Sequence, residues 1–170
     1  MNKLAAEEII NLLFLPMSDE KLLDIFEKLN IEVPVLDEEY EMEGSVWTEG
    51  EETSGIAIEF TKPNDYSEDA DPIVKQIDFY NEFKVSFPFG LHKEDSLETV
   101  IKKIGRNPDF CNKRMSWSKQ WVSPLRDMEI VYAVHFKRDM KSINTIVITK
   151  FNRKSVEADE FIFPCEELEE

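Results

Sequence analysis

The same order of hydrophobic patterns occurs twice along this chain, and this repetition limits its possible folds more than any other feature. Residues 19–29 and 95–104 each have the apolar spacing of an amphipathic helix, and stretches with the alternating period of β-strands follow each of them. The repeated positions lie 75 or 76 residues apart: Leu22 and Leu97, Ile25 and Val100, Phe26 and Ile101, Leu29 and Ile104, Ile58 and Val134, Phe60 and Phe136. With so few identities, chance periodicity is the alternative to a true internal repeat.

The repeat predicts an α+β fold with antiparallel sheets. We expect a single domain of two pseudo-repeated units, residues 1–83 and 84–170, in which helices cover the sheets on one side. The expected helices span residues 3–14, 19–29 and 95–104, with Ser18 and Asp95 starting the last two and Asn30 and Gly105 ending them. The second helix is expected to bury Leu22, Leu23, Ile25, Phe26 and Leu29. The expected strands span residues 39–42, 45–49, 55–61, 73–83, 115–122, 129–137, 142–151 and 161–163.

Between Lys28 and Lys62 the chain has no lysine or arginine. This gap, residues 29–61, contains ten acids, and the larger side chains of Tyr40, Met42 and Trp47 are threaded among them. Acids mixed with aromatic residues are typical of a protein interface that has packed anchors and a charged surround. We therefore predict a partner-binding surface made of Asp37, Glu38, Glu39, Tyr40, Glu41, Glu43, Trp47, Glu49, Glu51 and Glu52.

The net charge is distributed unevenly along the chain. Residues 1–73 hold 20 acids and 4 bases, whereas residues 74–170 hold 16 of each, so the whole net charge of −16 lies in the first part. A negative field this one-sided repels nucleic acid and anionic membranes and speeds the approach of a cationic protein. We expect a basic protein partner and neither nucleic acid nor membrane. Solubility alone is the simpler explanation of the acidity, but the concentration in one half disfavours it.

The sequence favours the cytoplasm. No apolar run approaches the ~20 residues that a membrane-spanning helix needs. Glu7 and Glu8 interrupt the apolar N-terminus and no cleavage site follows, so we expect no signal peptide. Cys111 and Cys165 lack the spacing of metal or redox pairs and are expected to be free thiols, with a disulfide between them as the alternative.

No combination of residues predicts catalysis, a cofactor or a bound metal. The clustered acids of residues 38–43 lack the differing environments that acid–base pairs require. His92 and His135 lie far from the cysteines, and His135 is expected to face solvent on its strand. A calcium loop lacks its usual glycine and distal glutamate, so a solvated loop is favoured for Asp65, Glu68, Asp69 and Asp71.

Basic and aromatic residues also alternate in the second half, a mixture found in single-strand nucleic-acid sites. The bases are Lys113, Arg114, Lys119 and Arg126, close in sequence to Trp117 and Trp121. Because the field of the whole chain opposes nucleic acid, we expect these bases to pair instead with acids of the first half or of the tail, Glu166, Glu167, Glu169 and Glu170.

The second half has a recognisable series of helix and strand signals. They are Phe89-Gly90, Asp95-Ser96-Leu97-Glu98, Ile104-Gly105, Pro108, a strand with Trp117, a strand ending in Val134-x-Phe136 and a strand with Ile146-x-Ile148. Across residues 85–151, and more weakly across 15–80, the chain resembles the helix-plus-sheet unit of the beta-lactamase inhibitor protein and of small outer-membrane assembly lipoproteins. Tandem copies of this unit are similar to folds of bacterial immunity proteins, which neutralise toxins delivered between competing cells. The resemblance implies an inhibitor or immunity role; the lipoprotein branch is disfavoured because a signal peptide and a lipid-bearing cysteine are missing.

Together these observations favour a cytoplasmic immunity or inhibitor protein that is not an enzyme. Its expected partner is a basic toxin domain, with a nuclease preferred because surfaces that attract phosphates also attract carboxylates. The alternative is a non-enzymatic adaptor or assembly protein that binds a cellular protein or its own kind. An enzyme with an unrecognised site is the least favoured hypothesis.

Overall fold

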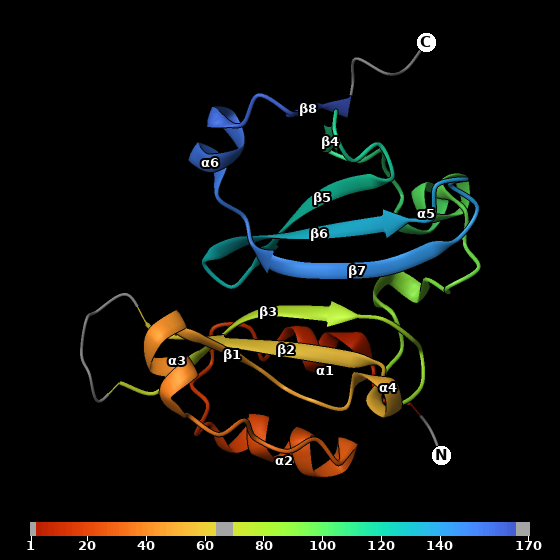
Figure 1. Ribbon diagram of the computed structural model, residues 1–170. Helices are drawn as coiled ribbons and strands as arrows, with labels where there is room; N and C mark the ends of the chain where they lie inside the picture. The colour runs from red at the N-terminus through yellow and green to blue at the C-terminus, as the bar shows by residue number, and fades with distance from the viewer. Residues whose placement is uncertain (1–2, 64–69, 166–170) are drawn as a thin grey trace. The chain divides into compact units, whose positions relative to one another are not determined.

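The computed structural model describes residues 3–63 and 70–165. The chain folds as α+β with antiparallel strand pairs, as the sequence predicted. It divides into two compact units, Met1–Pro88 and Phe89–Glu170, close to the expected boundary between residues 83 and 84 (Figure 1). Each unit is described by itself below.

The described part of the first unit contains a sheet in the order β1-β2-β3. Its strands are β1 (Ser45–Trp47), β2 (Ile56–Thr61) and β3 (Ile73–Phe79). Its helices are α1 (Ala6–Ile10), α2 (Glu20–Leu29), α3 (Glu38–Glu43) and α4 (Glu51–Ser54). The register pairs Val46 of β1 with Phe60 of β2, and a bulge lies between Glu59 and Phe60 where β2 meets β3.

Helix α2 begins one residue later than expected. The side chain of Asp19, not that of Ser18, forms the N-cap and accepts bonds from the backbone N–H groups of Lys21 at 2.9 Å and Leu22 at 3.2 Å. A carboxylate also interacts favourably with the positive end of the helix dipole, which favours Asp19 over Ser18 as the N-cap. The helix ends at Asn30, whose φ of 56° and ψ of 44° confirm the predicted left-handed cap.

The apolar face of α2 packs against β2. The rings of Phe26 and Phe60 meet edge to face with their centroids 6.1 Å apart, and neither side chain is exposed by more than 2%. Leu22 and Leu29 are buried with them, as predicted. The prediction was wrong for Leu23, which is 41% exposed because the helical period turns it away from this face, and Ile25 is only half-buried.

The N-terminal segment is hydrogen-bonded to β3 and to residues 84–86, which follow β3 in the chain. The expected helix over residues 3–14 is shortened to α1, and the chain then runs beside β3. The N–H of Phe14 donates to the carbonyl of Val74 at 2.8 Å, and the N–H of Val74 donates to Leu15 at 3.0 Å. Leu4 forms a parallel bridge with Val85. These bonds satisfy backbone groups that a free N-terminal segment would leave to water.

Gly55 makes the turn between α4 and β2 with a φ of 88°, a conformation that disfavours other residues. A Cβ atom at this position would lie 2.2 Å from the carbonyl oxygen of Asn81. The carbonyl of Gly55 accepts bonds from Tyr80 at 2.7 Å and Asn81 at 3.1 Å, which closes the turn against the end of β3. Only glycine fits at this position.

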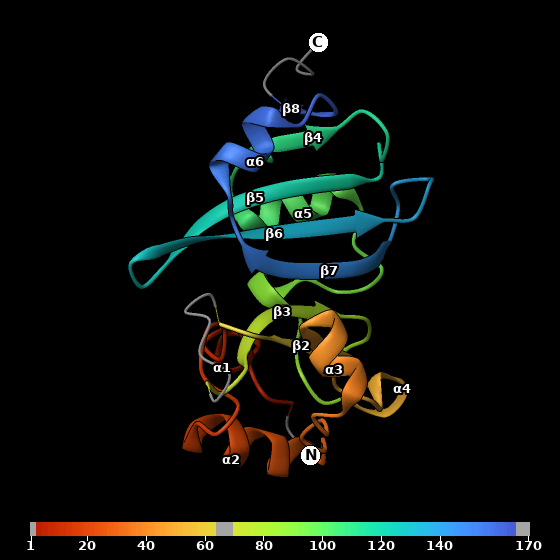
Figure 2. The same cartoon turned by 60° about the vertical axis from the view of Figure 1, so that its left-hand side comes forward.

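The described part of the second unit contains a sheet in the order β7-β6-β5-β4-β8 (Figure 2). Its strands are β4 (Phe110–Asn112), β5 (Ser118–Leu125), β6 (Met128–Phe136), β7 (Ile143–Lys150) and β8 (Ile162–Pro164). Its helices are α5 (Leu97–Ile104) and α6 (Arg153–Ala158), and the 3-10 turn η1 (Pro88–Gly90) lies where the two units join in sequence. The short elements α4, α6 and β4 were not predicted.

Helix α5 starts at Ser96, whose hydroxyl accepts a bond from the N–H of Thr99 at 3.3 Å. The expected cap, Asp95, instead accepts bonds at 2.8 Å from the N–H of His92 and from the ammonium of Lys103. The helix ends at Gly105 with a φ of 92°, as predicted. A lysine within the last turn therefore holds the residue that precedes the helix.

The core of the second unit is centred on β5 and β6. Trp121 is fully buried, and its indole N–H donates to the carbonyl of Arg106 at 3.1 Å. Val100 of α5 is also fully buried, as are Ile146 and Ile148 of β7. On β6, Val134 and Phe136 are exposed by only 1% and 2%, but Val131 and Ala133 at the alternate positions are buried as well, so both faces of this strand are covered. Satisfying the indole N–H inside the core removes the cost of burying it.

Cys111 and Cys165 form a disulfide, so the prediction of free thiols was wrong. The two residues are separated by 54 positions, and their Cα atoms lie 5.3 Å apart. The pairing of β4 with β8 produces this approach, because Cys111 lies opposite Phe163 and the N–H of Cys165 donates to Asp109 at 3.3 Å. The structure therefore contains the disulfide that was the alternative to free thiols.

The two units have a similar order of elements. Helix α2 is followed by β1, β2 and β3, and helix α5 is followed by β5, β6 and β7, in each case with the second of the three strands in the middle. The first unit adds α1, α3 and α4, whereas the second adds β4, α6 and β8. This order agrees with the predicted repeat without testing it, so the repeat and the one-sided helical cover stay predictions.

Candidate functional site

Residues 38–43 form helix α3, so the strand predicted over residues 39–42 was wrong. Asp37 is the N-cap, and its carboxylate accepts a bond from the N–H of Tyr40 at 3.2 Å. Glu38, Glu39 and Glu41 lie in the first turn, where negative charge interacts favourably with the helix dipole. Gly44 ends the helix in the left-handed conformation, with a φ of 77°. The alternation of acids with Tyr40 and Met42 was too short to distinguish a strand from a helix.

Strand β1 follows α3 and lies at the edge of its sheet. Its far end is fixed by Thr48, which is 5% exposed. The N–H of Thr48 donates to the carbonyl of Ile58 at 2.9 Å, and its hydroxyl accepts a bond from the N–H of Ile58 at the same distance. The strand is thereby anchored at one end by α3 and at the other by a buried threonine.

The loop over residues 32–36 is held at both ends. Ile31 before it is 7% exposed, and its N–H donates to the carbonyl of Phe26 at 2.8 Å. Asp37 after it is fixed as the cap of α3. Between these points the loop presents apolar side chains to solvent, and Val35 is 78% exposed.

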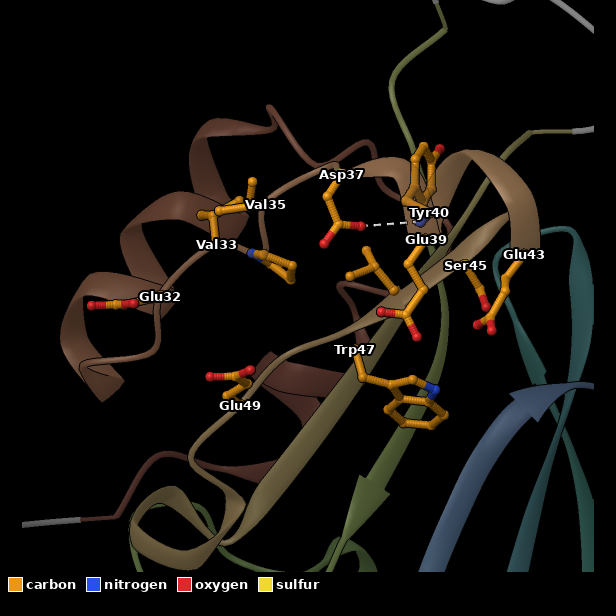
Figure 3. A pocket seen from close by; sticks show the side chains of 12 residues that line it. Glu32, Val33, Val35, Asp37, Glu39, Tyr40, Glu43, Ser45, Trp47 and Glu49 are labelled. Atoms are coloured by element: carbon orange, nitrogen blue, oxygen red, sulfur yellow. Dashed lines mark hydrogen bonds between the residues drawn. The ribbon is translucent and has the colours of Figure 1, made fainter.

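A pocket lies between this loop, α3 and β1, with a volume of about 420 Å³. It is lined by Glu32, Val33, Pro34, Val35, Asp37, Glu39, Tyr40, Glu43, Ser45, Val46, Trp47 and Glu49. Figure 3 shows the carboxylates of Asp37 and Glu39 projecting between the loop and β1, with Glu32 and Glu49 toward one end and Glu43 toward the other. We call this the acidic pocket.

Five carboxylates line the acidic pocket without a lysine or arginine among its lining residues. Among the residues that the structure describes, no ion pair neutralises Glu32, Glu39, Glu43 or Glu49. The two lysines that bound this segment are engaged elsewhere: Lys28 pairs with Asp24 at 3.1 Å, and Lys62 is bonded to the carboxylate of Glu41 at 3.2 Å, and neither lines the pocket. Because like charges repel, a cation that enters the pocket lowers the electrostatic energy of the fold.

The structure brings six of the ten predicted site residues together in this pocket: Asp37, Glu39, Tyr40, Glu43, Trp47 and Glu49. The other four lie nearby in sequence but outside its lining, with Glu38 and Glu41 on α3 and Glu51 and Glu52 at the start of α4. The prediction missed Glu32, Val33, Pro34, Val35, Ser45 and Val46. Glu32 belongs to the same lysine-free gap, so the gap itself was the signal that could have included it.

The two aromatic residues of the predicted site have different surroundings. Trp47 is 38% exposed at the pocket, so its ring is accessible to a partner. Tyr40 is only 4% exposed, and the ammonium of Lys62 lies 5.4 Å from the centre of its ring. Burial raises the pKa of Tyr40, an effect that the charge of Lys62 opposes. Most of Tyr40 therefore stabilises the fold, and contact with a partner falls mainly to Trp47.

Other clusters singled out from the sequence have structural surroundings. Arg114 stacks on Phe161 at 3.7 Å, and Lys113 lies 5.7 Å from the ring of Phe163. The acids expected to pair with these bases include the tail residues 166–170, which lie outside the described residues. Of the calcium alternative, Asp65, Glu68 and Asp69 also lie outside them, and the carboxylate of Asp71 accepts a bond from the hydroxyl of Ser18.

The structure also places the remaining titratable candidates. His135 is half-buried, not solvent-facing as predicted, and burial lowers its pKa. The carboxylate of Asp78 is buried, and this burial raises its pKa although Gln76 and Tyr80 donate hydrogen bonds to it. Within the described ranges, no group of three or more His, Cys, Asp or Glu side chains is arranged to hold a metal ion.

None of the helices that the structure describes has the length and apolarity that a bilayer crossing requires. No protein-family model, curated protein or solved structure matches this chain. The resemblance to the beta-lactamase inhibitor protein therefore stays a prediction. The candidate function depends on the acidic pocket alone.

Proposed function

We propose that this chain is an immunity or inhibitor protein that binds a basic toxin domain of the nuclease type and blocks it. The observation that carries the proposal is the acidic pocket, where five carboxylates gather beside an exposed tryptophan with no lining cation. The chain acts by binding, not by catalysis, and needs no cofactor. A nuclease is the preferred partner because its phosphate-binding surface carries the cations that the pocket lacks.

Charge and packing have separate tasks in this proposal. The carboxylates attract the partner over several ångströms and raise its association rate, an effect that salt screens. Trp47 and the exposed Val35 supply apolar contact once the partner has docked. A packed aromatic inside a charged surround is the usual composition of a binding hot spot.

The proposed role places the protein in the cytoplasm, where an immunity protein meets an incoming toxin. Thiols are kept reduced in that compartment, so the disulfide between Cys111 and Cys165 would open there. Both cysteines belong to the second unit, and the acidic pocket belongs to the first. Reduction is therefore compatible with the proposed binding mechanism.

The proposal is tested with the product of the gene next to the one that encodes this chain. Its growth-inhibiting activity is measured in a bacterial host with and without this chain, and the affinity of the purified pair is measured by calorimetry. Replacing Glu39 and Glu43 with lysine should lower the affinity by about tenfold or more and reduce the rescue of growth. Raising the salt from roughly 0.05 to 0.5 M should weaken binding of the native protein.

A matched control changes the same amount of charge elsewhere in the first unit. Glu8 and Glu27 are exposed and do not line the pocket, so their replacement by lysine should leave affinity and rescue nearly unchanged. Equal losses for both pairs would show that only net charge matters and would remove the pocket from the proposal. Tight binding that ignores both salt and charge reversal would overturn the charge mechanism.

The adaptor alternative has no specific structural observation in its favour. If the neighbouring product neither inhibits growth nor binds, and this chain self-associates in gel filtration, the immunity proposal is wrong and an assembly role takes its place. The same purified proteins therefore distinguish an immunity role from an assembly role.

A further inference from the structure

The free edge of β1 has outward-facing backbone groups at Ser45 and Trp47. The N–H of Lys62 donates to the carbonyl of Gly44, and the N–H of Thr48 donates to the carbonyl of Ile58. Gly44 with Lys62 and Thr48 with Ile58 are therefore hydrogen-bonded pairs of the β1–β2 ladder. Because such pairs alternate with non-bonded ones in an antiparallel ladder, Val46 also bonds to β2. Ser45 and Trp47 occupy the non-bonded positions, so their N–H and C=O groups point away from the sheet.

The acidic pocket runs along this edge. Val46 lies on one face of β1, and Ser45 and Trp47 lie on the other, since successive side chains of a strand alternate. All three residues nevertheless line the same pocket. The pocket therefore extends along three consecutive residues of β1, beside the strand whose outward N–H and C=O groups lie at its free edge.

The geometry points to an occupant for this edge: we propose that an extended segment of the basic partner adds to β1 as an antiparallel strand. This inference rests on the proposed function and specifies how the partner binds. Main-chain bonds to Ser45 and Trp47 would hold the segment, as in other proteins that bind by strand addition. Its alternate side chains would be lysine or arginine, placed among the carboxylates of Glu39, Glu43 and Glu49.

Charge complementarity selects this occupant over a second copy of the chain. An edge strand of another copy would bring β1 and the same carboxylates into the pocket, and like charges facing each other are destabilising. An apolar segment would leave the carboxylates without counter-charges. A cationic segment both satisfies the edge and neutralises the pocket, while its smaller side chains contact Val35 and Trp47.

The first test measures binding of short synthetic peptides to the full chain by calorimetry. The probe is a capped peptide in which lysine alternates with threonine. One comparison peptide has glutamate in place of lysine, and a second keeps every lysine but is N-methylated at alternate residues, which blocks the hydrogen bonds of one edge. We expect the lysine peptide to bind, the glutamate peptide not to bind, and N-methylation to weaken binding by about tenfold or more.

The second test uses substitutions at Trp47, whose N–H faces the open edge. Trp47→Pro removes that donor without removing a bond between β1 and β2, and proline is tolerated at such edge positions. Trp47→Ala removes the same ring and keeps the donor, so the two variants differ chiefly in the N–H group. The peptide should bind Trp47→Pro several-fold more weakly than Trp47→Ala, with circular dichroism confirming that both are folded.

The outcomes separate this inference from the proposed function. Equal affinity for the methylated and unmethylated lysine peptides would overturn strand addition and leave a charge-only mode of binding. Failure of the lysine peptide to bind would also overturn it, even if charge reversal at Glu39 and Glu43 abolishes growth rescue. If growth rescue itself ignores charge reversal, the proposed function fails whatever the peptides do.

Discussion

Strands β1 and β8 end the strand orders of the two units, and they differ in how they are protected. In the second unit the β4–β8 pair is joined by the disulfide, and the side chains of Lys113 and Arg114 lie on rings of Phe163 and Phe161. In the first unit β1 has the acidic pocket beside it, whose lining includes five carboxylates and no lysine or arginine. Edge strands are templates for unwanted pairing, and charge is one of the ways in which proteins protect them.

The difference shows how an edge can be protected and still bind. In the second unit, under oxidising conditions, a covalent link ties the segment of β8 to β4, and cations stack on its aromatic rings. Carboxylates repel most strands but favour a cationic one, so the protection is selective. The acidic pocket can thus be understood as an edge left open to a single class of partner.

The largest expected effect concerns the packing of α2 against β2, the strand that pairs with β1. Phe26→Ala removes a fully packed ring from the interface of α2 with β2 and should lower the free energy of unfolding by about 3–5 kcal/mol. Leu23→Ala on the same helix removes a side chain that is 41% exposed and should cost less than about 1 kcal/mol. Urea denaturation measures both, and equal costs would show that α2 does not pack on β2 as described.

A smaller effect is expected from opening the protected edge. Replacing Cys111 and Cys165 with serine removes a link across 54 positions and should lower the free energy of unfolding by about 2–4 kcal/mol. Peptide affinity at the acidic pocket should not change, because the pocket and the disulfide belong to different units. Calorimetry under oxidising conditions checks this, and a large loss of affinity would break the distinction between the two edges.

The smallest effect concerns the pH dependence of the first unit. Burial raises the pKa of Asp78 above its ordinary value of 3.8, so the folded state holds this proton more tightly than the unfolded state. Its contribution to stability is therefore full below pH 3.8 and is lost as the pH rises through the raised pKa. Asp78→Asn removes this titration and should become more stable relative to the native protein over that window.

The measurement is the difference in unfolding free energy between the native protein and Asp78→Asn as a function of pH. Subtracting the two curves cancels groups that titrate alike in both proteins. A difference that does not vary with pH would show that the pKa of Asp78 is not raised in the folded state.

The sequence was sufficient for the elements with a clear period. Strand β2, the apolar face of α2 and the left-handed caps Asn30 and Gly105 follow from local patterns. The lysine-free gap likewise indicated a site, and six of its predicted residues line one pocket. Composition sufficed there because the pocket is built from neighbouring residues of one segment.

The remaining features depend on contacts that local patterns do not contain. The disulfide requires β4 to pair with β8 across most of the second unit, and cysteine spacing alone does not determine such pairing. Helix α3 required choosing between two periods over four residues, and Asp37 as a cap was the overlooked signal. Which residues line the pocket depends on the position of the loop over residues 32–36, and this position is set by the hydrogen bonds of Ile31 and Asp37 at its two ends.

The continuity of the acidic pocket has a practical consequence for chemical mapping. All of its lining residues lie between Glu32 and Glu49, a stretch without a lysine or arginine. Trypsin cuts after lysine and arginine but cuts poorly where proline follows. Because Pro63 follows Lys62, digestion should release residues 29–75 as one fragment. A carboxylate-directed cross-link from a partner's lysine would shift the mass of that single peptide, and the docking surface would be located by one peak in a mass spectrum.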